Sequence, residues 1–152
     1  MRYLTALLLV LVVIGGCSSP SASAQVSAAA SAQAGAVTLV CGSIAALKVS
    51  VDTFRSLDPA TTSQDTYAAA LDGIRGAWTA VQNNLARLTS TNAQLVQTSY
   101  QALSQAWQAQ PTGASVTTSL TAVKPEAQQL ADALTQVNSG LNCPPIPTPT
   151  AS

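Results

Sequence analysis

Few residues in this chain could carry out chemistry. The 152 residues include three cysteines and six acidic residues but no histidine. Without an imidazole, Ser-His and Cys-His nucleophile pairs, imidazole proton transfer and the usual zinc or haem ligand sets are excluded together. We therefore expect no metal site and no cofactor, and the commonest enzyme mechanisms are unavailable to the chain.

Paired carboxylates are the remaining route to acid-base catalysis, and their spacing argues against it. Asp65 and Asp72 lie seven positions apart in one expected helix, a separation of about 10 Å along its axis. The spacings of Lys48, Asp52 and Arg55 are those of exposed ion pairs on a helix. These charges indicate a solvated surface, so we expect no catalytic residues and a non-enzymatic protein.

The residues before Cys17 have the pattern of an export signal. Arg2 precedes the apolar run Leu4–Ile14, whose eleven residues are too few for a helix that crosses a bilayer core, which needs about 20. The run is followed by Gly15, Gly16 and Cys17. An ordinary secretory signal followed by a coincidental cysteine is the alternative interpretation.

The sequence Ile14-Gly15-Gly16-Cys17 resembles the lipobox of bacterial lipoproteins. The resemblance implies that residues 1–16 are a signal peptide and that Cys17 is lipidated at the new amino terminus. It also implies a lipid-anchored protein on the extracytoplasmic face of the cell membrane. Two acyl chains are sufficient for stable anchoring, so no transmembrane helix is required.

Export bears on the other two cysteines, Cys41 and Cys143. Exported proteins fold in an oxidising compartment, so we expect a disulfide between them. Two separately buried thiols are the alternative.

The composition restricts the partners of the chain. Its formal net charge is zero, and its few basic residues are scattered along the sequence. Nucleic-acid binding requires a basic patch, so it is not expected. Beyond the lipobox, the chain resembles small Ala-rich helical lipoproteins of actinobacteria, a loose similarity that carries no functional motif.

Apolar residues recur at alternating steps of three and four in four successive stretches, as in helices that bury one face. The stretches run from Val37 to Phe54, from Tyr67 to Leu88, from Val96 to Trp107 and from Val116 to Leu141. Thr62 or Ser63 is the expected cap of the second helix, and Thr91 that of the third. Pro125 is expected to kink or restart the last element, over residues 115–141.

Four helices with short connections predict an all-α, four-helix up-down-up-down bundle closed by one disulfide. An even number of helices places Cys41 and Cys143 at the same end, where they could pair. We expect the bundle over residues 36–143. It would follow a lipid anchor and flexible linker over residues 17–35 and precede a Pro/Thr-rich disordered tail over residues 144–152. Within the linker, Ala28–Ala34 could instead extend the first helix backwards.

The aromatic residues give one indication of a binding site. Trp78 and Trp107 both lie on inward stripes, where core packing is favoured over a pocket. The third helix has the smallest side chains around its stripe, so a ligand groove would lie beside it, near Tyr100 and Trp107. For Gly73 and Gly76 in the second helix, close packing of a neighbouring helix is favoured over a notch for a partner.

Two functions are compatible with these features. The first is a membrane-tethered interaction module of the cell envelope, attached to the membrane through the lipid on Cys17. Its partner would be an unidentified envelope protein or glycan. The alternative is a carrier or binding protein for a small apolar ligand or lipid held between the helices.

Overall fold

The chain folds as a four-helix bundle. The computed structural model describes the backbone of residues 22–146 and the side chains of residues 34–146. Over these residues it consists of helices and connecting turns, which confirms the all-α prediction. The elements are α1 (Ala22–Ser56), α2 (Gln64–Gln82), the short 3-10 helix η1 (Leu85–Arg87), α3 (Ser90–Gln108) and α4 (Val116–Gly140).

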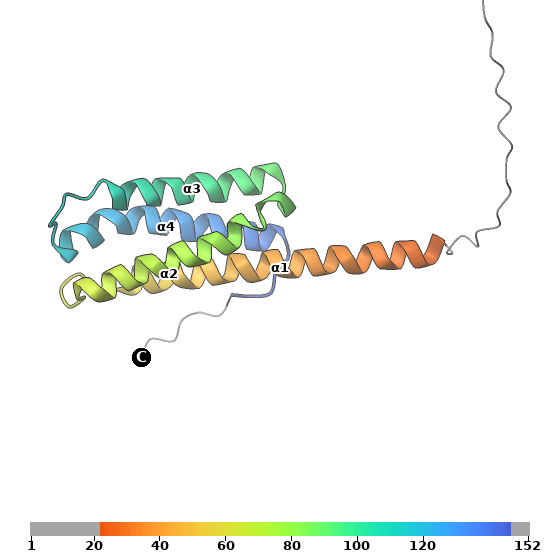
Figure 1. The fold of residues 1–152 in the computed structure, drawn as a ribbon, viewed down its shortest axis with the longest axis horizontal. Coiled ribbons are helices and arrows are strands. Elements are labelled where there is room, and N and C mark those ends of the chain that lie inside the picture. The colour runs from red at the N-terminus through yellow and green to blue at the C-terminus, as the bar shows by residue number, and fades with distance from the viewer. Residues whose placement is uncertain (1–21, 147–152) are drawn as a thin grey trace, which may run out of the picture.

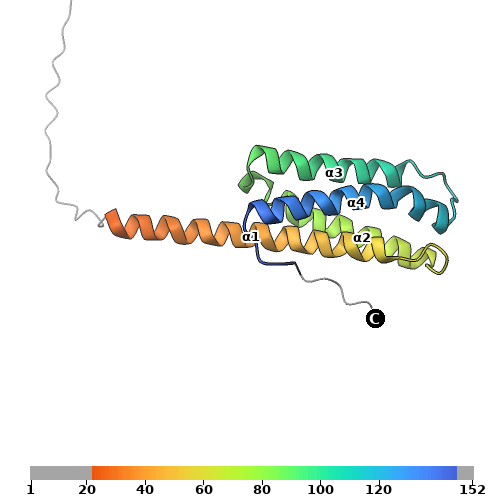
Figure 2. The same ribbon diagram turned by 180° about the vertical axis from the view of Figure 1, so that it is seen from behind.

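Successive helices run in opposite directions (Figures 1 and 2). The backbone of α1 packs closely against α2 and α4, and α4 also packs against α3. We call the end with the α2–α3 connection and the C-terminal turn the base, and the end with the loops over residues 57–63 and 109–115 the distal end. The up-down-up-down order is consistent with these contacts.

The predicted apolar stripes meet in one core. The largest of its fully buried side chains, each less than 2% exposed, come from all four helices. They are Phe54, Ile44, Leu47, Ile74, Leu103, Leu120, Leu130, Leu134, Val51, Val81, Val96 and Val123. Burial of these side chains is the main source of stability for the bundle, because removing apolar surface from water is the dominant favourable term in folding.

Capping side chains define where the helices begin. Ser63 caps α2 as predicted, through a bond from the Thr66 amide to its hydroxyl. The cap of α3 is Thr89 and not Thr91, so that prediction was wrong by two residues. The second helix ends earlier than predicted, at Gln82, and the 3-10 helix follows it. Leu85 and Leu88 of the predicted stripe still pack against the core.

Pro125 lies inside α4, which continues as one helix from Val116 to Gly140. Of the two alternatives predicted for Pro125, a kink and a restart, the restart is not observed. Pro125 is exposed, so water can solvate the backbone carbonyl group that loses its hydrogen-bond donor.

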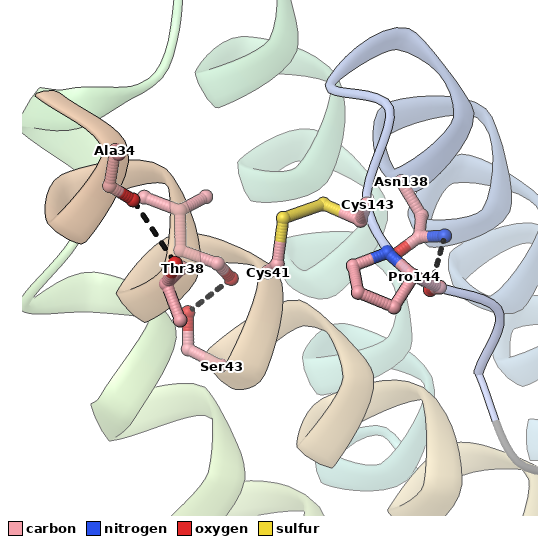
Figure 3. Close-up of a disulfide and its surroundings, with 8 residues drawn as sticks. Ala34, Thr38, Cys41, Ser43, Asn138, Cys143 and Pro144 are labelled. Atoms are coloured by element: carbon pink, nitrogen blue, oxygen red, sulfur yellow. Dashed lines mark hydrogen bonds between the residues drawn. A yellow bond between two sulfur atoms is a disulfide. The ribbon is translucent and has the colours of Figure 1, made fainter. Parts of the chain in front are cut away.

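A tight turn after α4 brings Cys143 back to α1 (Figure 3). The Cys143 amide donates to the Asn138 carbonyl, and the Asn142 amide donates to that of Ser139. These two bonds form a Schellman motif, in which Asn142 takes the left-handed conformation with a φ of 53°. The turn places Cys143 beside Cys41, with 5.5 Å between their Cα atoms, and the predicted disulfide is present.

Helix α1 is much longer than its neighbours. Its 35 residues give a length of about 52 Å, whereas the 19 residues of α2 span about 29 Å. The amino-terminal part projects alone beyond the base (Figure 1). Residues 22–35 therefore differ from the flexible linker expected over 17–35. Their alanines have high helix propensity, and they continue a helix that the core already nucleates.

One segment of the described helices, Ala34–Ser56 of α1, is long and apolar enough to cross a membrane by length and composition. Core helices pass the same test. The apolar stripe of this segment includes Ile44, Leu47, Val51 and Phe54, all at 0% exposure against the other helices. Packing in the bundle accounts for this stripe, whereas Val37 and Leu39 near the start of the segment are exposed.

The glycines of α2 contradict the favoured prediction of close helix packing. An added Cβ at Gly73 or Gly76 would meet no heavy atom within 4 Å.

Gly73→Ala and Gly76→Ala should each raise the free energy of unfolding by up to about 1 kcal/mol, measured by urea denaturation. Gly113 is the contrasting control because its φ is +82°, and Gly113→Ala should lower stability by about 1–2 kcal/mol. Destabilisation by either α2 substitution would show that these glycines are needed for packing.

Candidate functional site

Aromatic side chains fill the seam between α2 and α3, which are not among the closely packed helix pairs of the described chain. Trp78 of α2 stacks on Tyr100 of α3, with ring centroids 4.0 Å apart and 9° between the planes. Tyr100 meets Trp107 edge to face at 5.8 Å and 81°. The Arg75 guanidinium of α2 lies 5.2 Å from the Trp107 ring centroid and completes the bridge.

A cleft of about 420 Å³ opens where this aromatic packing ends, at the distal end of the bundle. Side chains of α2 form one wall, and the end of α3 with the α3–α4 loop forms the other. Ser119 of α4 also lines the cleft. The lining residues are Gln64, Tyr67, Leu71, Arg75, Trp107, Gln110, Pro111, Gly113, Ala114 and Ser119.

Local hydrogen bonds hold the loop that forms this wall. The Ala114 amide donates to the Pro111 carbonyl across a turn in which Gly113 supplies the positive φ. The Gln110 side chain donates through Nε2 to the Ala106 carbonyl at 2.8 Å, which orients its amide group. Ser115 caps α4 immediately after the loop. The wall is therefore formed before any ligand binds.

The neighbouring loop between α1 and α2 is fixed on α4. Thr117 donates through Oγ1 to the Pro59 carbonyl at 2.7 Å, and Lys124 donates through Nζ to the Leu57 carbonyl at 2.6 Å. Both bonds join the chain across more than fifty residues. They make the distal end a connected surface that can hold the cleft in shape.

Two tyrosines at the cleft and the aromatic seam have altered ionisation. Burial raises the pKa of Tyr67 above its ordinary value, while the Ser119 side chain and the Arg75 charge oppose the rise. Burial likewise raises the pKa of Tyr100, again opposed by Arg75. In both cases the folded protein favours the neutral phenol.

These shifts predict alkaline destabilisation. The unfolded tyrosines release their protons near their ordinary pKa of about 10, and the folded ones only at higher pH. Below the ordinary tyrosine pKa, the raised native pKa values give the folded state its full stabilisation. This stabilisation is lost as the pH rises through the native pKa values. Urea midpoints measured from about pH 9 to 11 should fall, and less steeply in a Tyr67→Phe, Tyr100→Phe variant. Equal slopes for the two proteins would contradict this account.

A second cleft, the basal groove, lies beside the disulfide and has a volume of about 510 Å³. Its lining is mainly apolar and comes from α1 and the turn after α4. The residues are Val37, Thr38, Cys41, Gly42, Ala45, Asn142, Pro144 and Pro145. Figure 3 shows how the disulfide places the Cys143–Pro144 segment opposite Cys41 and Thr38.

The charged residues of α1 form a network that crosses to α4. The Asp52 carboxylate accepts from Lys48 at 2.5 Å and from Arg55 at 2.7 Å. Arg55 also donates to Gln128, which in turn donates to Asp132 at 2.8 Å. The side chain of Asp52 is only 14% exposed, so this is not the fully solvated face expected from the sequence. The hydrogen bond between Arg55 and Gln128 joins α1 to α4. Because the charges of the network are paired with one another, it is not an open binding site.

The three aromatic residues predicted beside a groove lie together, but they have different roles. Trp107 lines the distal cleft, whereas Tyr100 and Trp78 pack behind it and support its ring. Cys41 and Cys143 form the disulfide, and Cys17 lies outside the described residues. The sequence interpretation missed Tyr67 and Arg75 as cleft residues, because on α2 they share the face that carries the buried stripe.

Comparison with protein-family models, curated proteins and solved structures finds no match to this chain. By its fold and its site, the chain is a disulfide-closed four-helix bundle with a cleft at its distal end.

Proposed function

We propose that this protein is a non-enzymatic, lipid-anchored interaction module on the extracytoplasmic face of the cell membrane, and that its distal cleft binds a component of the cell envelope. The observation that carries the proposal is the position of the cleft. It lies at the distal end of the bundle. The amino-terminal part of α1, which follows Cys17 in the sequence, projects from the opposite end, the base. A lipid on Cys17 would hold the base toward the membrane and the cleft away from it.

The projecting part of α1 supports this arrangement. The stretch from Ala22 to Val37 has a length of about 22 Å as a helix. Only four residues separate Cys17 from Ala22. This helix would act as a spacer between the bilayer and the bundle, so that the cleft can contact material beyond the membrane surface.

The residues of the cleft support binding over catalysis. The chain has no histidine, and Arg75 is the one charged residue that lines the cleft. Its Nη1 atom is 2.7 Å from the Asp72 carboxylate, so the charge is already paired. A nucleophile with an adjacent base is not assembled among the lining residues, whereas aromatic rings and amides suited to recognition are.

In-cell photo-crosslinking tests the proposal. A benzoylphenylalanine placed at Gln64, an exposed residue at the cleft, should form a discrete adduct with an envelope component on irradiation. The matched control is the same replacement at Gln101, which is also exposed but does not line the cleft. Identical adduct patterns at the two positions, or adducts at Gln101 alone, would contradict the proposal.

A carrier for a small apolar ligand or lipid is the second candidate function, and the basal groove is the observation that favours it. The groove is apolar and lies at the end expected to face the membrane. In contrast, the positions between the helices are filled by fully buried side chains. Native mass spectrometry of the membrane-purified protein should detect a stoichiometric apolar molecule beyond the covalent lipid if the carrier function is correct.

A further inference from the structure

The chemistry of the distal cleft narrows the kind of ligand that it can bind. Its volume of about 420 Å³ falls in the usual range for small-ligand pockets, about 300–1,000 Å³. The inference drawn from it rests on the proposed function, because it concerns the same cleft.

An aromatic ring, that of Trp107, forms part of one wall, and two neighbouring side chains fix its orientation. Trp107 is partly exposed, and the edge-to-face contact with Tyr100 and the Arg75 guanidinium hold its ring. Tyr100 is held in turn by the stack on Trp78. A tryptophan that is oriented in advance can pack against the C–H face of a sugar ring with little loss of side-chain entropy.

The polar groups of the cleft can both donate and accept hydrogen bonds. Gln64 provides a planar amide with both functions, and the hydroxyl groups of Tyr67 and Ser119 also provide both. Gln110 provides its amide oxygen and the N–H that is not bonded to the Ala106 carbonyl. A ligand with many hydroxyl groups matches such a mixture, because each hydroxyl donates one bond and accepts others. A purely apolar ligand would bury these groups without partners and would bind poorly.

The charge of the cleft favours a neutral ligand. Arg75 is its one lining cation, and it forms an exposed ion pair with the Asp72 carboxylate at 2.7 Å. An anionic ligand would have to compete with Asp72 for this guanidinium.

A proline-rich peptide is a poorer match to the polar groups of the cleft. Its backbone carbonyl groups accept hydrogen bonds, but its proline residues have no N–H to donate, so it would pair only with the donors among the amides and hydroxyls.

We propose that the distal cleft is a saccharide-binding site that holds a neutral sugar unit of an envelope glycan against Trp107, with Gln64, Gln110 and Arg75 around it. Tyr67 and Ser119 form the buried polar part of the site, at 7% and 5% exposure. Tyr100 and Trp78 are positioning residues that hold the Trp107 ring.

Titration of the full-length protein with oligosaccharides tests this assignment. The protein is purified in a detergent without a sugar headgroup, because a maltoside or glucoside would compete for the site. The probes are neutral tetrasaccharides of glucose, galactose, mannose and N-acetylglucosamine, a uronic acid tetrasaccharide and hexaproline. Trp78 and Trp107 are the only tryptophans, so a sugar on Trp107 should change the fluorescence directly. At least one neutral probe should bind saturably with a Kd below about 1 mM.

Variants locate the binding in the cleft, with calorimetry as a second readout. Trp107→Ala should raise the Kd by about tenfold or more, and the exposed Gln64→Ala by about threefold to tenfold. Gln101→Ala, outside the cleft, should leave it unchanged. Far-UV circular dichroism establishes that each variant is folded, and Gln64→Ala keeps the test valid if Trp107→Ala unfolds.

Three results would overturn the saccharide assignment. These are the absence of saturable binding by every neutral tetrasaccharide, binding that Gln64→Ala leaves unchanged, and tighter binding of hexaproline or the uronic acid probe. The outcome is separable from that of the proposed function. A Gln64-specific adduct in cells together with no saccharide binding would retain the interaction module and remove its sugar ligand. Saccharide binding without such an adduct would retain the sugar site and contradict the proposed function.

Discussion

Reduction of the Cys41–Cys143 disulfide should lower the free energy of unfolding by about 2–5 kcal/mol. The disulfide joins residues 102 positions apart and connects α1 to the turn after α4, so it restricts the unfolded chain over nearly the whole bundle. Without it, the unfolded state gains entropy and the C-terminal turn loses its covalent attachment. Urea denaturation followed by circular dichroism, with and without a reductant, measures the change.

A Cys41→Ser, Cys143→Ser variant supplies the control for that experiment. It should unfold at the lower urea concentration of the reduced protein, and added reductant should have no further effect on it. Coincident unfolding midpoints for the oxidised and reduced wild-type protein would show that the disulfide does not contribute to stability.

The second large effect is expected from the core of α1. Leu47 is 0% exposed, whereas Leu39, two turns earlier on the same helix, is 57% exposed. Leu47→Ala should lower the free energy of unfolding by about 2–5 kcal/mol, because it removes buried methyl groups and leaves a cavity. Leu39→Ala should change it by no more than about 0.5 kcal/mol.

This pair of substitutions also tests the role of the apolar segment Ala34–Ser56. The same chemical change is made twice in one helix, so helix propensity contributes equally to both results. A large effect for Leu47 alone is what packing in a bundle requires. Similar effects at the two positions would contradict the packing of α1 described above.

The bundle could be predicted because the pattern that specifies each helix lies within one stretch of the sequence. Each apolar stripe repeats with the helical period, and an even number of helices brings Cys41 and Cys143 to one end. The start of α1 was not predictable from that pattern, since residues 22–35 carry few large apolar side chains. Their alanines favour helix, but a Ser- and Gln-containing stretch with this composition is also typical of linkers.

The distal cleft was predictable only in part. The small side chains of α3 indicated a groove near Trp107, and Trp107 does line the cleft. Arg75 lies four residues after Leu71 and three before Trp78, so in the sequence it is a charged residue that interrupts the apolar stripe of α2. This position did not indicate a cleft residue. Its contact with Trp107, and the approach of Ser119 from α4, depend on how the helices assemble, which no single stretch of sequence specifies.

The proposals share one requirement, that the base of the bundle faces the membrane. Lipidation of Cys17 would impose this orientation, and the disulfide holds Cys143 at the same end of the bundle. The saccharide site would then face the envelope glycans beyond the membrane, while the basal groove would lie nearer the lipid.

Intact-mass spectrometry of the protein purified from its native membrane tests the anchoring most directly. The account predicts a chain that begins at Cys17, has lost residues 1–16 and carries the mass of a diacylglyceryl group. A chain that begins at Cys17 or later without added lipid, or one that retains residues 1–16, would contradict it.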